Sequence, residues 1–238
     1  MRPSAGSDPA DPAAPDLLVE GLRVMADARR CLLLVERLFV PAGQSVAVRG
    51  ASGAGKSTFL HALCGLVRPQ AGSVRWGEHD MASFSAAGSA AFRRRHVGLI
   101  FQDYHLFEEL SALGNAGLAA SFAPPADREH IRRGAGQWLD RLGLGGTGGR
   151  NVASFSGGER QRIAVARALA GDPPIVLADE PTASLDRAAA DALADDLAGL
   201  GRSGKRTLIA VTHDAALASL LDRQVTIVDG RIVEDSDG

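Results

Sequence analysis

A glycine-rich stretch of nine residues constrains this chain more than any other feature. It follows residues 45–49, an apolar segment that predicts a buried strand, and it leads into residues 58–64, which predict a helix closed by Gly65. Glycines let the backbone bend so that successive N–H groups point inward at phosphate oxygens. The pattern therefore predicts a phosphate-binding loop between a strand and a helix, formed by Gly50, Ala51, Ser52, Gly53, Ala54, Gly55, Lys56, Ser57 and Thr58.

Two side chains of this loop carry its chemistry. Lysine occurs only at Lys56 and Lys205, so a chain with few lysines places one of them inside the loop. We expect Lys56 to reach the β- and γ-phosphates of a nucleotide and the Ser57 hydroxyl to ligate Mg²⁺. The positive end of the helix dipole adds to the attraction for phosphate. The alternative is a glycine-rich turn that matches the pattern by chance.

A second candidate site lies at the end of the apolar run 175–178, where Asp179 and Glu180 follow. The run predicts a buried strand that delivers both carboxylates to the edge of the sheet where ligands bind. Asp179 would hold Mg²⁺, directly or through water, and Glu180 would orient or deprotonate an attacking water. Strands often end in acidic residues, so this motif alone is not specific. It indicates a nucleotide site because a phosphate-binding loop precedes it in the chain.

A third motif, residues 154–162, runs directly into an apolar helix. Ser156 predicts an N-cap, and Glu159 three residues later completes a capping box. Gly157 and Gly158 leave the first N–H groups of the helix open, which suits a second phosphate-binding site. The alternative is an ordinary well-capped helix.

The remaining pattern predicts an α/β fold. Residues 17–48 read as several strands, 72–77 and 96–101 as further strands, 128–142 as an amphipathic helix and 143–150 as a loop. After residue 156, helices and strands alternate, which indicates a mostly parallel sheet covered by helices. We expect a disordered tail over residues 1–16 and a helical segment at about 102–155 that interrupts the core.

Composition excludes several classes of protein. The chain has 238 residues with 28 acidic and 26 basic side chains, a balance that argues against a nucleic-acid partner. It contains no run of about eighteen apolar residues, the length that a membrane-spanning helix needs. Two cysteines, Cys31 and Cys64, suit a reducing cytosol, and the N-terminus lacks the apolar region of a secretory signal.

The order of these motifs, closed by a strand that ends in His213, resembles the ATP-binding cassette (ABC) ATPase family over about residues 17–233. The segment FSGGE resembles the family signature LSGGQ, from which Phe155 and Glu159 depart. The resemblance implies an α/β P-loop NTPase of the ABC ATPase fold, with an antiparallel β subdomain and an inserted helical subdomain. Its single domain would span 17–238, with a RecA-like core over 17–101 and 156–238 and the helical subdomain over 102–155.

The resemblance also implies further site residues. Gln102 matches the Q-loop glutamine that contacts Mg²⁺, and His213 matches the switch histidine that contacts the γ-phosphate. Asp186 ends the segment Ser184–Asp186, which matches the D-loop at the dimer interface. Taken singly, Gln102 would be a solvated boundary residue and His213 a polar strand end. Within the ordered set, Lys56, Gln102, Glu180 and His213 are the expected catalytic residues, and Ser57, Gln102 and Asp179 the expected metal ligands.

One feature departs from the family. Its members usually carry an aromatic residue about 25 residues before the P-loop that stacks on adenine, and residues 22–31 contain no aromatic side chain. The equivalent position falls near Ala26. We expect weaker nucleotide affinity or weaker base selectivity, with Arg29 or Arg30 supplying a guanidinium plane.

The resemblance implies two kinds of partner, a second cassette and a membrane-spanning permease. The glycine pair of one subunit completes the P-loop of another, so we expect an ATP-dependent homodimer or a heterodimer with a second cassette. Residues 101–115 would dock a membrane-spanning permease at the cytoplasmic face of the membrane. Together with TASLD, residues 182–186, this segment resembles lipoprotein-releasing, macrolide-export and cell-division cassettes.

These observations predict an ATP-hydrolysing motor subunit that uses ATP and Mg²⁺ to drive export or lipoprotein release. One alternative is an ABC ATPase that regulates a membrane complex without transport. Another is an ABC ATPase without a membrane partner, in DNA repair or translation. The third is a scaffold that binds nucleotide without hydrolysing it, against which Asp179 and Glu180 argue.

Overall fold

The computed structural model describes residues 14–202 and 204–237. Its strands form one sheet in the order β5-β4-β1-β2-β10-β9-β3-β8-β7-β6. Strands β3, β8, β7 and β6 pair in parallel, and β9 pairs in parallel with β3. The strands are β1 (Leu17–Met25), β2 (Cys31–Val40), β3 (Ser45–Arg49), β4 (Ala71–Trp76), β5 (His79–Asp80), β6 (Val97–Ile100), β7 (Ile175–Asp179), β8 (Thr207–Val211), β9 (Arg223–Val228) and β10 (Arg231–Asp237).

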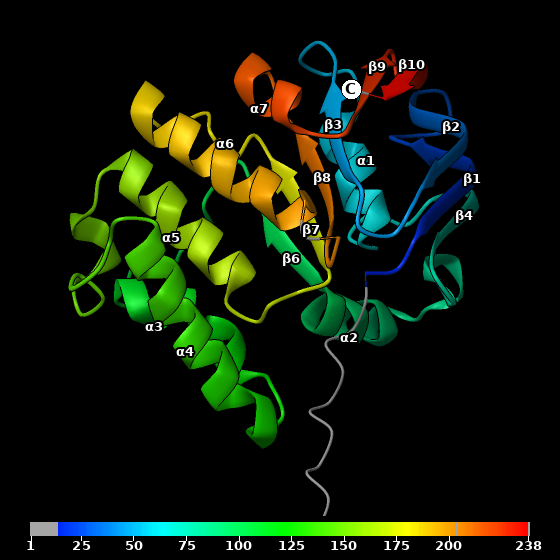
Figure 1. Ribbon diagram of the computed structural model, residues 1–238. Coiled ribbons are helices and arrows are strands. Elements are labelled where there is room, and N and C mark those ends of the chain that lie inside the picture. The colour runs from blue at the N-terminus through cyan, green and yellow to red at the C-terminus, as the bar shows by residue number, and fades with distance from the viewer. Residues whose placement is uncertain (1–13, 203, 238) are drawn as a thin grey trace, which may run out of the picture.

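The antiparallel strands form one flank of this sheet. β1 pairs antiparallel with both β2 and β4, β4 with β5, and β9 with β10. A parallel bridge between Arg231 and Leu34 joins β10 to β2, so the antiparallel flank continues the parallel strands. In Figure 1 this flank lies at the right, opposite the helices α3, α4 and α5.

Helices cover both faces of the parallel strands. The α-helices are α1 (Lys56–Leu63), α2 (Ala86–His96), α3 (Ala112–Ala116), α4 (Pro125–Arg141), α5 (Gly157–Leu169), α6 (Arg187–Arg202) and α7 (Ala215–Leu220). Short 3-10 turns occupy η1 (Met81–Ser83), η2 (Leu118–Ser121) and η3 (Val152–Ser154). None of the helices in residues 14–202 and 204–237 is long and apolar enough to span a bilayer.

The two faces of β7 explain its unbroken apolar sequence. Ile175 and Leu177 pack in the core around α1, whereas Val176 and Ala178 pack in the core formed with α5 and α6. Every residue of β7 is buried. Side chains on a strand alternate between faces, so a strand covered on both sides must be apolar throughout. Packing on both faces of β7 fixes the position of Asp179 at the end of the strand.

Element boundaries differ from the sequence expectations by a few residues. Helix α4 begins at Pro125, three residues before the expected start, because proline suits the first helical position, where its missing N–H costs nothing. Helix α1 begins at Lys56 and ends at Leu63, β4 is shifted by one residue from its expected range, and β6 is one residue shorter than expected at each end. The helix α2 was not expected, because Ala86–His96 combines alanines with four consecutive basic residues at its end and has only two buried residues.

The expected N-terminal tail lies mainly outside the described residues, which begin at residue 14. Residues 14–16 are held against the sheet. Ala14 is buried, the Pro15 carbonyl accepts from the Thr207 hydroxyl at 3.3 Å, and the Asp16 carbonyl accepts from Gly77 N at 2.9 Å.

Candidate functional site

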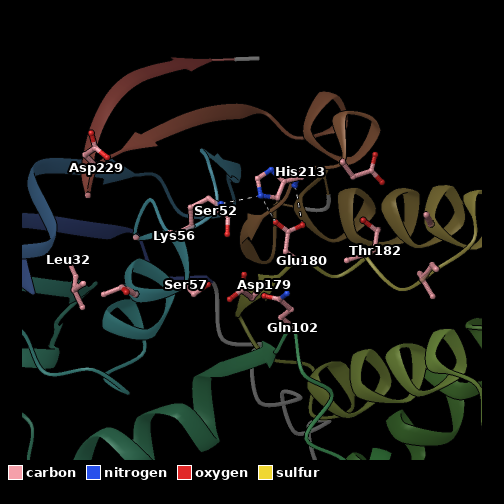
Figure 2. A pocket seen from close by; sticks show the side chains of 18 of the residues that line it. Leu32, Ser52, Lys56, Ser57, Gln102, Asp179, Glu180, Thr182, His213 and Asp229 are labelled. Atoms are coloured by element: carbon pink, nitrogen blue, oxygen red, sulfur yellow. Dashed lines mark hydrogen bonds and ion pairs between the residues drawn. The ribbon is translucent and has the colours of Figure 1, made fainter. Parts of the chain in front are cut away.

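A cavity of about 890 Å³ opens at the carboxyl ends of β3, β7 and β8. In open α/β sheets, ligands bind at this edge. Figure 2 shows side chains from the P-loop, β7 and the segment after β8 converging on it. Among the expected site residues, its lining includes Ser52, Gly53, Gly55, Lys56, Ser57, Thr58, Gln102, Asp179, Glu180 and His213.

The backbone of the P-loop requires glycine at two points. Gly50 has φ 148°, and a Cβ there would lie 2.1 Å from the carbonyl oxygen of Ile227. Gly55 has φ 101° at the N-cap of α1, and its Cβ would lie 2.7 Å from the carbonyl oxygen of Leu32. Residues with a side chain rarely adopt such φ values. Neighbouring strands therefore hold the loop so tightly that only glycine fits. Gly50, Ala51 and Ala54 support the loop from outside the lining of the cavity.

Lys56 is buried and bonded within the loop. Its ammonium donates to the carbonyl oxygens of Gly50 at 2.8 Å and Ala51 at 2.9 Å, and it lies 3.2 Å from Nε2 of His213. An ammonium has three N–H donors and no acceptor, so two of its donors are used by these carbonyls, and the third reaches Nε2 in the tautomer that leaves this nitrogen unprotonated. A phosphate that binds in the loop would meet a cation already held in place.

Glu180 lies at a sharp turn at the end of β7. Its backbone is left-handed, with φ 48°, and its N–H donates to the Val211 carbonyl at 2.9 Å. Its carboxylate accepts from the backbone N–H of His213 at 3.1 Å and lies 3.4 Å from the His213 imidazole. A left-handed backbone is unfavourable for glutamate. The end of β8 thus holds this carboxylate on the rim of the cavity, beside Lys56 (Figure 2).

The oxygen donors of the cavity fit Mg²⁺. Asp179 is buried, and its Oδ1 atom has no hydrogen-bond partner. Ser57 and Gln102 line the same cavity. Mg²⁺ prefers hard oxygen ligands and is usually held by one or two carboxylates together with substrate phosphates. Within the described chain, no group of three or more His, Cys, Asp or Glu side chains forms a cage for a metal, so phosphate oxygens and water would complete the coordination.

The capping box predicted at Ser156 is present. The Ser156 hydroxyl accepts from Glu159 N at 3.3 Å, and the Glu159 carboxylate accepts from Ser156 N at 2.8 Å and from its hydroxyl at 2.8 Å. The backbone N–H of Ser156, and then its hydroxyl, lower the pKa of Glu159. These bonds fix the start of α5.

The structure does not bring the motif at the start of α5 into the cavity of its own chain. Ser156, Gly157, Gly158 and Glu159 are absent from the lining. A Cβ on Gly158 would lie 3.2 Å from the carbonyl oxygen of Ser184, so the segment Ser184–Asp186 packs directly beside it. Asp186 also stays outside the cavity, where its carboxylate accepts from Ala189 N at 3.0 Å.

Another part of the cavity is formed by the turn between β1 and β2 together with the start of β2. Arg30, Cys31 and Leu32 line it, whereas Arg29 does not. Asp27 orders this turn, because its carboxylate accepts from the backbone N–H groups of Arg29 at 2.8 Å and Arg30 at 3.0 Å, and these bonds lower the pKa of Asp27. No phenylalanine, tyrosine or tryptophan of the described residues lines the cavity.

Sequence reasoning missed several residues of the cavity. Thr182 is buried, and Arg187 binds the carboxylates of Asp191 and Asp214. Thr182 lies in the turn after β7, Arg187 begins α6, and Asp214 caps α7 after β8, so the pairing of β7 with β8 brings them together. The sequence signal that could have found them is their position in the segments that follow a buried parallel strand. The additional lining residues are Thr182, Ala183, Leu185, Arg187, Ala190, Asp214, Asp229 and Gly230.

Comparisons with known proteins agree with this geometry. A solved dimeric structure of an ATP-binding cassette in a post-hydrolysis state, bound to ADP and Pi, has a TM-score of 0.85 and 29% identity over 93% of this chain and 98% of that one. It confirms the predicted ABC ATPase fold. The Macrolide export ATP-binding/permease protein MacB of Sodalis glossinidius is 46% identical over 84% of this chain, which spans 30% of that relative's length.

A shorter relative matches over most of its own length. The Lipoprotein-releasing system ATP-binding protein LolD of Oleidesulfovibrio alaskensis is 40% identical over 84% of this chain and 86% of its own. The ABC transporter family matches residues 37–183, which include the P-loop, Ser156–Glu159 and Glu180. On this match, and on the cavity that the P-loop and Glu180 line, the chain belongs to the ABC transporter family.

Proposed function

We propose that this chain is the ATP-binding and ATP-hydrolysing motor of an ABC transporter, which couples ATP-driven dimer closure to a membrane permease. One observation carries the proposal. Lys56, Glu180 and His213 meet at one cavity, whereas the open N–H groups of Gly157 and Gly158 lie outside it. A γ-phosphate in the P-loop still needs charge stabilisation on its other side. A second cassette supplies it, so two ATP molecules are held between two subunits.

Each residue then has a role that its position supports. The P-loop N–H groups and Lys56 bind the β- and γ-phosphates. Ser57, Gln102 and Asp179 would hold Mg²⁺, which would supply positive charge against the phosphates. Glu180 orients or deprotonates the attacking water, and His213 contacts the γ-phosphate. Ser156, Gly157, Gly158 and Glu159, together with Asp186, form the surface that meets the partner cassette.

The permease docks on the helical side of the molecule. Phe107 and Leu113 are exposed there, while Asn115 holds Phe107 in place through a bond to its carbonyl at 2.9 Å. Residues 101–110 of this dock contain five large apolar or aromatic residues, of which only Phe107 is exposed and the others are half-buried: Phe101, Tyr104, Leu106 and Leu110. The helical segment 102–155 forms the subdomain that carries this surface, beside a RecA-like core over 17–101 and 156–238.

The relatives support the export or lipoprotein-release type of transporter. One is named for macrolide export and the other for lipoprotein release. We therefore place the chain on the cytoplasmic face of the membrane, bound to a permease, as a homodimer or as a heterodimer with a second cassette.

Phosphate release from the purified chain with Mg²⁺ and ATP tests the proposal. We expect steady turnover that Glu180→Gln abolishes, because the amide cannot accept a proton from water. Glu180→Gln should still bind ATP, since the P-loop is intact. A wild-type chain that binds ATP but releases no phosphate, alone or with its permease, would support the scaffold alternative.

A further inference from the structure

Arg167 connects the last turn of α5 to the segment that carries Gln102. Its guanidinium donates from Nη1 to the carbonyl oxygen of His105 at 2.5 Å and from Nη2 to that of Tyr104 at 2.8 Å. Guanidinium stays charged in proteins, so both hydrogen bonds are charge-assisted. Among the described residues, no carboxylate forms an ion pair with Arg167, and burial lowers its pKa. Its hydrogen bonds therefore go to the backbone of this one segment.

The segment after Gln102 has a backbone that needs support. Residues 101–107 belong to no helix or strand, and His105 is left-handed with φ 47°. The rings of Phe101 and His105 meet edge to face with centroids 4.9 Å apart, so the chain turns back on itself. Left-handed backbone is unfavourable for a residue with a side chain. The bond from Arg167 to the His105 carbonyl acts at this strained point.

Tyr104 provides a second connection, to the other end of the same helix. A Cβ on Gly157 would lie 3.3 Å from the Tyr104 hydroxyl oxygen. The Tyr104 carbonyl thus contacts the last turn of α5 while its hydroxyl lies beside the first turn. This side chain therefore extends along α5, between Arg167 and the glycines at the helix start.

We infer that Arg167 is a positioning residue, which holds the segment of Gln102 against α5 so that Gln102 and the donors of Gly157 and Gly158 move together. The inference rests on the proposed function of those groups. Gln102 lines the cavity of its own chain, whereas Gly157 and Gly158 do not. Because the connection between them is rigid, ATP that binds in the cavity and moves Gln102 also moves Gly157 and Gly158. These glycines belong to the surface that meets the partner cassette.

Arg167→Met tests this inference, because methionine keeps an unbranched side chain and removes the donors. We expect ATP affinity within about twofold of the wild type and kcat lower by roughly ten- to a hundredfold, since misplacement of a reacting group slows chemistry more than binding. Arg167→Lys retains a charge that can reach one carbonyl at a time, so it should recover part of the lost kcat. Hydrogen exchange over residues 101–107 should be faster in Arg167→Met.

Arg93 offers a matched control. Its guanidinium also donates to two backbone carbonyls, those of Cys64 at 3.2 Å and Gly65 at 3.1 Å, but it lies outside the cavity. Arg93→Met should lower thermal stability and leave kcat and exchange over 101–107 unchanged.

Two results would overturn the inference. One is wild-type kcat and wild-type exchange in Arg167→Met. The other is an equal loss of kcat in Arg167→Met and in Arg93→Met when the two variants have the same drop in melting temperature. Such a result would mean that the loss of kcat follows from lower stability in general. Failure of the proposed function has a different signature. The wild type would then lack ATP turnover, while exchange over 101–107 would still report whether Arg167 holds the segment.

Discussion

Nζ of Lys56 lies 3.2 Å from Nε2 of His213, although 157 positions separate the two residues in the chain. Lys56 opens α1 after β3, and His213 follows β8, which pairs with β3 in parallel. The pairing of these two strands brings the ammonium of the P-loop and the histidine to one edge of the sheet. Glu180, from the next strand, completes the group.

Lys56→Met should abolish most turnover. The substitution removes the ammonium that donates to Gly50 and Ala51 and leaves an apolar chain of similar length. We expect phosphate release to fall by about 10² to 10³, the usual cost of losing one preorganised charge donor in an active site. Lys205→Met, which changes the other lysine of the chain and lies outside the cavity, should keep wild-type turnover.

The capping box should stabilise the fold in a pH-dependent way. Hydrogen bonds from Ser156 hold the pKa of Glu159 below its ordinary value of about 4.5. A carboxyl with a lowered pKa in the folded state contributes stability above its unfolded pKa, and this contribution disappears as the pH falls through the folded pKa. Glu159→Ala should therefore lower the melting temperature at neutral pH, and the difference from the wild type should shrink below about pH 4. An equal difference at all pH values would argue against the ionised cap.

Base selectivity should be weak. A nucleotide base at the β1–β2 end of the cavity meets Arg30, Cys31 and Leu32 in place of an aromatic ring. Stacking on an aromatic ring contributes about 1–3 kcal/mol per base, and a guanidinium plane stacks on any base. We expect dissociation constants for ATP and GTP within about tenfold of each other, and Arg30→Ala to weaken both. A hundredfold preference for ATP in equilibrium binding would contradict this account.

The two cysteines should differ in reactivity. Cys31 is exposed and lines the cavity, whereas Cys64 is buried and its pKa is raised to about 11 by burial. Thiolate is the reactive form, so Cys64 stays protonated and inert at neutral pH. We expect iodoacetamide to label Cys31 alone, and ATP to slow that labelling by covering it. Mass spectrometry of the labelled peptides measures both effects, and labelling of Cys31 that ATP leaves unchanged would place the base elsewhere.

The parts of the site that the sequence predicts are those with strong local physics. The P-loop needs glycines at fixed positions, Ser156 and Glu159 satisfy a helix end, and the buried apolar residues of β7 lead directly to Asp179. Each of these requirements acts within a few residues, so it produces a local sequence pattern from which the structure can be predicted.

The parts that the sequence does not predict depend on long-range packing. Arg187 and Asp214 come together because α6 and the end of β8 lie side by side, and no local pattern reports this. The contact of Arg167 with Tyr104 and His105 joins residues more than sixty positions apart. Helix α2 has few buried residues, so it lacks the periodic apolar face that makes helix α4 recognisable.

The mass of Glu180→Gln in solution, measured by light scattering with saturating MgATP, tests the central claim most directly. The variant retains the P-loop and Lys56 but cannot hydrolyse ATP, so two ATP molecules should keep two chains together. We predict a dimer that dissociates when ATP is removed, and a monomer when Ser156→Arg is added, because the larger side chain blocks the approach of the partner. A variant that binds ATP and stays monomeric would contradict the account.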